Sequence, residues 1–389
     1  MNRDPRLVNC GSVLVLSQNL PYFENIGHPQ RNYRGYKDLV MKELEQLPIP
    51  LLMWYRENAR KLPWRESPTP YRVWLSEVML QQTRVAAVLE YYRRFLEAAP
   101  TVEGLASLPE DELMKLWQGL GYYSRARNLQ KAARQIVTEH GGIFPNTYEG
   151  IRALPGVGDY TAGAIGSIAF GLPTPAVDGN VLRVVSRICA DEGDIIAPRT
   201  RKRYTAALAE IIPVKAPGDF NQAMMELGAT VCLPNGAPLC EMCPAKNFCR
   251  AYLEGKTETL PVKTAKKPRK IEERTVFLIF HENEVALRRR AKKGLLAGLW
   301  EFPNEPGADL PGEWGLEPRE LKLSAVGKHI FTHIEWRMTA LSGELDSSEL
   351  PEGWVWADKY EIRHQYAIPN AFKFVEEAVE KRLGYHYDL

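Results

Sequence analysis

The sequence predicts two modules of different fold class, a mainly α-helical domain followed by a smaller α+β domain. Apolar residues recur with helical spacing from about Leu47 to Leu253, with short polar turns between the segments. A basic, proline-punctuated stretch follows, and beyond it the period changes to that of a β-rich run at 275–280. A chain of 389 residues that is 45% hydrophobic is long enough to bury two or three cores.

Changes in hydrophobic periodicity and composition along the chain also predict the domain boundaries. The predicted segments are an N-terminal extension at 1–34 without sustained periodicity, a helical domain at 35–254, a basic interdomain linker at 255–273 and an α+β domain at 274–389.

Helices in the first domain are predicted from caps and apolar spacing. Thr69 and Pro70 are the residue types preferred at the N-cap and the first helical position, and we expect their helix to continue to Phe95. Two further helices are expected near 111–118 and 125–140.

Short β-rich runs recur in the second domain. Strands are expected near 275–280, 285–288, 335–341 and 353–356, before a closing helix at about 371–383.

A Pro-Gly-x-Gly turn that contains Gly156 and Gly158 joins two helical patterns. Backbone N–H groups of such a turn, at a helix N-terminus, bind anionic oxygens, and a nucleic-acid phosphate is the natural candidate. Asp178 follows some twenty residues later, which places a carboxylate within plausible reach of the sugar joined to that phosphate. The alternative is an ordinary helix–turn–helix joint with a solvated aspartate.

Composition narrows the class of protein. No apolar run approaches the roughly 18–20 residues that span a bilayer, so no membrane segment is expected, and we predict a cytoplasmic or nucleoid-associated protein. The net charge of +2 does not by itself indicate a nucleic-acid binder. The distribution of charge along the chain is more informative about partners. Basic clusters occur at 199–203, 263–270 and 288–293, and together they modestly favour a polyanionic partner.

Four of the six cysteines fall within the segment 232–249. The set consists of Cys232, Cys240, Cys243 and Cys249. Their spacing suits four thiolate ligands of either zinc or a [4Fe–4S] cluster. The absence of histidine from the set, and its place at the end of a helical domain, favour the iron–sulfur cluster in a structural role.

Several strings in this chain resemble the helix-hairpin-helix DNA glycosylases, and more closely the adenine DNA glycosylases of the MutY type. The resemblance covers about residues 45–383. Besides the turn and the cysteine loop, the matching strings are Leu62-Pro63-Trp64-Arg65, Ser76-Glu77-Val78-Met79-Leu80-Gln81-Gln82-Thr83, Gln118-Gly119-Leu120-Gly121-Tyr122-Tyr123 and Val177-Asp178-Gly179-Asn180. A C-terminal match, Gly294 to Pro303, resembles the opening loop of the Nudix-like domain of these enzymes.

The resemblance implies catalytic roles for two carboxyl groups. Glu77 matches the proton donor to the adenine, and its apolar neighbours are expected to raise its pKa and keep it protonated near neutral pH. Asp178 matches the carboxylate that stabilises the sugar cation. Tyr160 stands where lyase members of the superfamily have lysine, so a monofunctional glycosylase is expected, with Tyr160 and Asn180 positioning the sugar.

The remaining site residues are implied by the same resemblance. The expected adenine pocket comprises Arg60, Leu62, Trp64 and Arg65. Expected DNA contacts comprise Gln82 and Tyr122 in the base stack, Gly156 and Gly158 at a phosphate, and Phe331, Thr332 and His333 at 8-oxoguanine. Threonine stands at 332 where the family has serine, which keeps the hydroxyl and adds a methyl group.

The implied partner is double-stranded DNA that carries adenine opposite 8-oxoguanine or guanine, bound by a monomer. One alternative is a bifunctional lyase for oxidised pyrimidines, which would have lysine at position 160. A damage-binding protein without catalysis would lack Glu77 or Asp178, and both are present. The glutamate-rich helix of true Nudix hydrolases is missing, so pyrophosphatase activity is not expected.

Overall fold

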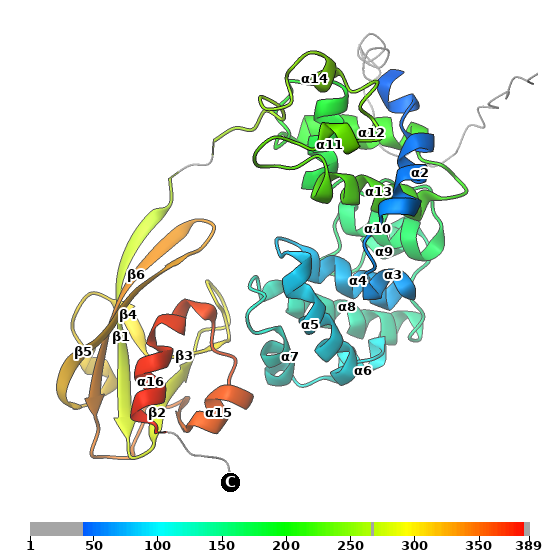
Figure 1. Ribbon diagram of the computed structural model, residues 1–389. Helices are drawn as coiled ribbons and strands as arrows, with labels where there is room; N and C mark the ends of the chain where they lie inside the picture. Colours follow the sequence, from blue (N-terminus) through cyan, green and yellow to red (C-terminus); the bar gives the residue numbers. More distant parts are fainter. Residues whose placement is uncertain (1–41, 266–267, 385–389) are drawn as a thin grey trace, which may run out of the picture.

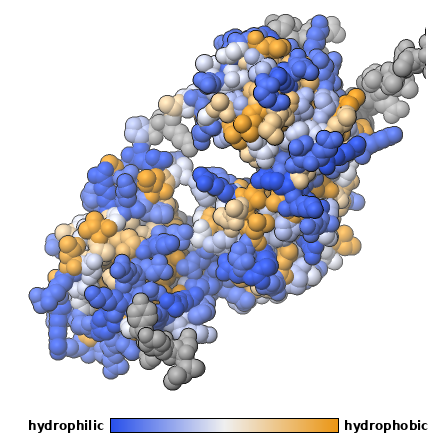
Figure 2. Space-filling model, viewed as in Figure 1, coloured by the Kyte–Doolittle hydropathy of each residue, from blue (hydrophilic) through white to orange (hydrophobic). Residues whose placement is uncertain are grey.

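The computed structural model describes residues 42–265 and 268–384, and the predicted extension at 1–34 lies outside the described residues. A helical domain and a β-rich domain lie beside each other, and the chain passes between them in one long connection (Figure 1). On the face seen in Figure 2, hydrophilic residues cover most of both domains and apolar residues form separate patches. Within the described ranges, no helix has the length and apolar character needed to cross a membrane.

The helical domain is built from two hydrophobic clusters of described residues. The helices of the first cluster are α3 (Pro63–Glu66), α4 (Pro70–Leu80), α5 (Val85–Ala98), α6 (Val102–Ser107), α7 (Glu110–Trp117), α8 (Ser124–His140), α9 (Tyr148–Arg152) and α10 (Asp159–Phe170). The second cluster joins α2 (Pro48–Asn58), α11 (Gly179–Ile188), α12 (Pro198–Ile211), α13 (Pro217–Thr230) and α14 (Arg250–Leu253), and the 3-10 helix η2 (Cys240–Met242) lies between α13 and α14 in the chain. Because α10 packs on both α4 and α13, it joins the two clusters.

The helix predicted to run from Thr69 to Phe95 is wrong as a single element. The Thr69 side chain caps α4 as expected, but α4 ends at Leu80 and α5 begins at Val85. The guanidinium of Arg125, from α8, lies at this break, where its Nη1 donates to the carbonyls of Val78 (2.6 Å), Met79 (3.1 Å) and Gln81 (2.8 Å). A distant side chain therefore satisfies the carbonyl groups at this helix end.

The described part of the second domain contains one seven-stranded mixed sheet. Its strands are β1 (Lys270–His281), β2 (Glu284–Arg289), β3 (Trp300–Glu301), β4 (Asn304–Pro306), β5 (Arg319–Ile330), β6 (Ile334–Glu344) and β7 (Trp354–Ala357). The main path has the order β3-β2-β1-β6-β5, with β4 on β1 and β7 on β2. The β1–β6 pair is parallel and runs from Lys270↔Ile334 to Phe280↔Glu344.

Three features of this domain differ from the sequence expectation. Strand β1 begins at Lys270, inside the predicted linker, and β3, β4 and β5 were not predicted. The closing helix is divided into η4 (Asn370–Val375), which is a 3-10 helix, and α16 (Glu376–Arg382). Two other short helices, η3 (Gly312–Trp314) and α15 (Lys359–His364), lie in the connections.

The two domains share a packed interface. Leu299 is 1% exposed and belongs to a hydrophobic cluster of the helical domain. Lys115 of α7 donates to the carbonyl groups of Ile362 and Tyr366, both at 3.0 Å, and burial lowers the pKa of its amine to about 8. Arg289 of β2 reaches back to Asp111 at 2.7 Å. These contacts fix where the second domain stands relative to α7.

The arginines at 288–290 therefore do not form a free basic surface. Arg288 binds the buried carboxylate of Glu301 at 2.9 Å, and Arg290 pairs with the same carboxylate. With Arg289 bound to Asp111, all three guanidinium groups have partners inside the protein.

Candidate active site

Glu77 lies on α4 and is 5% exposed. Its neighbours along the helix, Trp74, Val78 and Met79, are buried in the same hydrophobic cluster. Burial raises the pKa of Glu77 from its ordinary value of 4.5 to about 7, against a hydrogen bond from Tyr160 that lowers it. The expected rise in pKa is confirmed. A carboxyl group with this pKa carries a proton in a large fraction of molecules at neutral pH, so it is able to act as a general acid.

Tyr160 stands in the first turn of α10, directly after the glycine turn. Its hydroxyl donates a hydrogen bond to Oε2 of Glu77 and contacts Sδ of Met225 at 3.2 Å. Burial, followed by the charges of Glu77 and Asp178, raises the pKa of Tyr160 well above its ordinary value. The phenol therefore stays neutral and serves as a donor that orients the Glu77 carboxyl group.

Asp178 is the N-cap of α11. Its Oδ1 accepts from the backbone N–H of Val181 at 2.8 Å, and its Oδ2 accepts from Nδ2 of Asn180, also at 2.8 Å. Burial raises the pKa of Asp178, and these two donors act in the opposite direction because they stabilise the anion. The capping role and a role in chemistry are compatible, since the cap holds the carboxylate in one orientation.

Asn180 is itself held from two sides. Arg183 donates from Nη2 to Oδ1 of Asn180 at 2.9 Å and to the carbonyl of Gly228 at 2.7 Å. Gly228 of α13 lies so close that a Cβ there would be 2.5 Å from Cβ of Asn180. The position of the Asp178 carboxylate therefore depends on a close contact between α11 and α13.

The four residues expected in the adenine pocket fall into two kinds. Leu62 and Trp64 are 5% and 6% exposed and pack in the first hydrophobic cluster. Arg60 and Arg65 both bind Glu226 of α13, at 2.6 Å and 2.8 Å. Burial alone would raise the pKa of Glu226, but hydrogen bonds from both arginines hold it at about 2.

The glycine turn lies between α9 and α10. Gly156 has φ +76°, in the left-handed region, and a Cβ there would lie 2.6 Å from Cβ of Asn128, so glycine is needed on both counts. Gly158 is the N-cap residue of α10, and a Cβ at this position would meet no atom within 4 Å. Space therefore remains in front of the helix N-terminus for a ligand to approach its backbone N–H groups.

Two turns hold non-glycine residues in the left-handed region. Gln82, in the break between α4 and α5, has φ +60°, and Tyr122, between α7 and α8, has φ +47°. Arg125 binds both turns, because its Nη1 donates to Gln81 and its Nη2 donates to the carbonyls of Leu120 and Gly121. Strained residues of this kind are concentrated at functional sites, and both side chains are exposed.

The segment 331–333 is the turn of the β5–β6 hairpin. Phe331 packs at its base, with its ring 4.9 Å from that of Trp336, whereas Thr332 and His333 are exposed. The hydroxyl of Thr332 lies 2.9 Å from the hydroxyl of Tyr122, across the domain interface. Two residues that are 210 positions apart in sequence, both expected at DNA, therefore meet.

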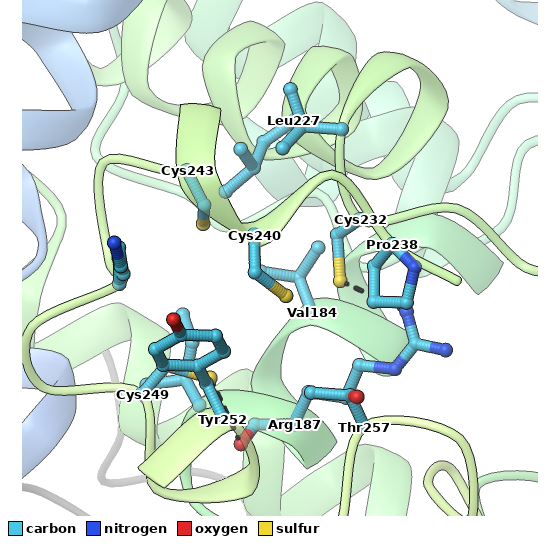
Figure 3. A pocket seen from close by; sticks show the side chains of 13 residues that line it. Val184, Arg187, Leu227, Cys232, Pro238, Cys240, Cys243, Cys249, Tyr252 and Thr257 are labelled. Atoms are coloured by element: carbon cyan, nitrogen blue, oxygen red, sulfur yellow. Dashed lines mark hydrogen bonds between the residues drawn. The ribbon is translucent and has the colours of Figure 1, made fainter. Parts of the chain in front are cut away.

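The four clustered cysteines line one cavity between α11, α13 and the loop that follows (Figure 3). Cys232, Cys240, Cys243 and Cys249 are all free thiols, and Arg187 donates from Nη1 to Sγ of Cys232 at 3.3 Å. Val184 and Leu227 supply apolar walls. No three His, Cys, Asp or Glu side chains of residues 42–265 and 268–384 stand close enough to hold a single metal ion.

Comparison with known proteins identifies the family. The model of the HhH-GPD superfamily base excision DNA repair proteins matches residues 75–213, and the NUDIX domain model matches residues 275–377. The human adenine DNA glycosylase is 36% identical over an alignment of 415 residues that covers 88% of this chain and 75% of that protein. The chain belongs to the adenine DNA glycosylase family.

Two further proteins are similar to parts of this chain. The adenine DNA glycosylase of Buchnera aphidicola subsp. Acyrthosiphon pisum is 39% identical over 256 residues, which cover 65% of this chain and 72% of that protein. The solved structure of a thermostable thymine-DNA glycosylase is 27% identical and covers 54% of this chain and 98% of that chain, with a TM-score of 0.49. As a member of this family, the protein is a hydrolase of N-glycosyl bonds in base excision repair, with a helix-hairpin-helix domain and a C-terminal Nudix domain.

Sequence reasoning missed two charged residues, Glu226 and Arg125, that organise the site. Glu226 lies three residues after Ala223, on the buried face of α13. A charged residue on the apolar face of a predicted helix is a signal that could have identified it. The sequence offers no comparable signal for Arg125, since its carbonyl partners belong to irregular turns.

Proposed function

We propose that the protein flips adenine out of a mispair with 8-oxoguanine or guanine and removes it by hydrolysis, leaving an abasic site. One observation carries the proposal: Glu77, buried on α4 with a pKa of about 7, accepts a hydrogen bond from Tyr160 and interacts electrostatically with Asp178 and Arg65. A base must leave the stack to reach such a site, and a mispaired base leaves most easily.

The chemistry divides between the two carboxyl groups. Glu77 gives its proton to N7 of adenine, the N-glycosyl bond breaks, and its electron pair leaves with the base. Asp178, held by Val181 and Asn180, carries the negative charge that stabilises the oxocarbenium-like sugar. Water then adds to C1′, and the proton that it releases returns to Glu77 through solvent.

Monofunctional chemistry is supported by the residue at position 160. A lyase needs an amine that forms a Schiff base with C1′ of the sugar. Tyr160 has a phenol whose hydrogen bond is directed to Glu77, so it orients the acid and leaves water as the nucleophile. Strand cleavage is therefore not part of the proposed reaction.

The adenine is proposed to lie against Arg60, Leu62, Trp64 and Arg65. Leu62 and Trp64 supply an apolar wall, and the two guanidinium groups supply hydrogen-bond donors to ring nitrogens. Pocket donors of fixed orientation discriminate between bases more strongly than apolar contact alone.

Recognition of 8-oxoguanine is proposed for the exposed hairpin turn of the second domain. Phe331 anchors the turn on Trp336, while Thr332 and His333 are exposed to a ligand. The contact between Thr332 and Tyr122 supports this role, because it brings the reading hydroxyl beside a residue proposed to enter the base stack. Gln82, in the neighbouring turn, is proposed to enter the stack as well.

Binding of double-stranded DNA by a monomer is proposed to use the glycine turn. Gly156 allows the tight turn, and the open space around Gly158 leaves room for a phosphate at the N-terminus of α10. Tyr160 follows Gly158 two residues later, in the first turn of this helix. A phosphate bound there would hold the sugar of the flipped nucleotide close to Glu77 and Asp178.

A [4Fe–4S] cluster is the cofactor proposed for Cys232, Cys240, Cys243 and Cys249. The donor set fits, since four free thiols line one cavity with apolar walls, and the Arg187 guanidinium beside Cys232 would balance thiolate charge. The cluster would tie the loop after α13 to α11, whose first residues follow Asp178. Substitution of Cys240 by serine should lose the visible iron–sulfur absorbance and lower the melting temperature.

A single-turnover assay tests the proposed function. Duplexes with adenine opposite 8-oxoguanine, guanine or thymine are incubated with the wild type, Glu77→Gln and Asp178→Asn. Excision opposite 8-oxoguanine and guanine but not thymine, lost in both variants, is expected. Retention of the wild-type rate in Glu77→Gln, or nicked strands before alkali treatment, would contradict the proposed mechanism.

A further inference from the structure

Glu226 is a buried carboxylate with an unusually complete set of donors. Its side chain is 1% exposed. Its Oε1 accepts from the backbone N–H of Arg60 at 3.1 Å and from Nε of Arg60 at 2.6 Å, and its Oε2 accepts from Nη2 of Arg60 at 2.9 Å and Nη2 of Arg65 at 2.8 Å. Charge-assisted bonds of this kind fix both orientation and protonation state.

The partners of Glu226 come from the opposite side of the site. Arg65 belongs to α3, and Arg60 lies in the connection between α2 and α3, some 160 residues before α13. Arg65 also donates to the carbonyl of Arg60 at 3.0 Å and lies over the ring of Tyr55. One carboxylate therefore holds the backbone and guanidinium of Arg60 in the connection and the guanidinium of Arg65 in α3, which are two of the four residues of the proposed adenine pocket.

The same carboxylate balances the charge next to the proposed acid. The groups that face Glu77 are Tyr160 from α10, Asp178 at the start of α11 and Arg65 from α3. The positive charge of Arg65 favours the anionic form of Glu77 and so lowers its pKa. Glu226 is bonded to the same guanidinium at 2.8 Å, so its negative charge lies beside the positive charge that faces Glu77.

We propose that Glu226 is a positioning residue for adenine excision, which holds Arg60 and Arg65 in the pocket and keeps their charge from removing the proton of Glu77. This inference rests on the proposed function, because it assigns the acid to Glu77. Glu226 acts through the arginines and touches neither the base nor the sugar.

The pH dependence of the single-turnover rate tests this role in the intact protein. The wild-type rate should fall as pH rises past about 7, when Glu77 loses its proton. In Glu226→Gln the uncompensated charge of Arg65 should move this inflection down by about one pH unit. Glu226→Asp, the matched control, keeps the charge and should leave the inflection near the wild-type position even where the rate itself falls.

A second variant keeps the test decisive if Glu226→Gln does not fold. Arg65→Met removes the positive charge that faces Glu77, so its inflection should lie at or above that of the wild type. An inflection that stays in place in Glu226→Gln, or one that moves down in Arg65→Met, overturns the proposal. Wild-type rates in Glu77→Gln would instead overturn the proposed function, so the two failures are distinguishable.

Discussion

Replacement of Glu77 by glutamine should stabilise the protein at neutral and alkaline pH while it abolishes excision. The pKa of Glu77 is about 7 in the folded chain and 4.5 ordinarily, so the folded state holds this proton more tightly than the unfolded state. Stability from this group is therefore fully present below pH 4.5 and is lost as pH rises through 7. Glutamine removes the ionisation and keeps an oxygen that accepts the Tyr160 hydrogen bond.

The magnitude follows from the two pKa values. Each pKa unit is worth about 1.4 kcal/mol. Ionisation of Glu77 therefore lowers the free energy of unfolding by about 1 kcal/mol at pH 5 and by about 3 kcal/mol at pH 8. For a domain of about 200 residues, 1 kcal/mol changes the melting temperature by about 2–4 °C. The melting temperature of Glu77→Gln should thus exceed that of the wild type by about 6–12 °C at pH 8 and by only about 2–4 °C at pH 5.

Thermal melts followed by circular dichroism between pH 5 and pH 8 measure this difference. The matched control is Glu66→Gln at an exposed position of α3, which gives the effect of the same substitution at the surface. The reasoning would be refuted if the melting temperatures of Glu77→Gln and the wild type differed by the same amount at pH 5 and pH 8. A carboxyl group with an ordinary pKa makes no pH-dependent contribution to stability in this range.

Three further perturbations test the site. Tyr160→Phe removes the hydrogen bond that lowers the pKa of Glu77, so the alkaline inflection of the single-turnover rate should move to higher pH. Thr332→Val removes the hydroxyl that meets Tyr122, and the ratio of excision rates opposite 8-oxoguanine and guanine should fall about fivefold, the worth of one hydrogen bond, whereas Thr332→Ser retains it. Gly228→Ala places a Cβ against Asn180, so it should destabilise the protein by about 1–3 kcal/mol in urea unfolding and slow excision.

Each of these expectations has a clear contrary result. An inflection that moves down in Tyr160→Phe would show that the hydroxyl stabilises the protonated acid. An unchanged preference in Thr332→Val would exclude the hydroxyl from discrimination. Gly179→Ala is the control for Gly228→Ala, since its Cβ meets no atom within 4 Å, and equal stability of the two variants would argue against the close contact.

The sequence was most informative where residue type and local spacing decide the structure. Thr69 caps α4 as expected, and Gly156 adopts the left-handed conformation that a tight turn between helices requires. The raised pKa of Glu77 also followed from its apolar neighbours on one helix. In each case the physical cause lies within a few residues of the group concerned.

The features that escaped prediction depend on residues far apart in the chain. No glycine or proline marks the end of α4, because Arg125 of α8 provides the partners of its last carbonyl groups. Strand β5 is an edge strand with few buried side chains, so Ala325 and Gly327 give no apolar alternation to recognise. The role of the Glu226 carboxylate follows from its ion pairs with Arg60 and Arg65, which are far from it in sequence.

The guanidinium of Arg125 connects the turn that contains Gln82 to the turn that contains Tyr122 by hydrogen bonds. Five carbonyl groups, from Val78 through Gly121, share this one side chain, so neither turn can relax its left-handed residue without loosening the other. The two residues that are proposed to enter the base stack are therefore braced by one buried guanidinium group in the protein alone.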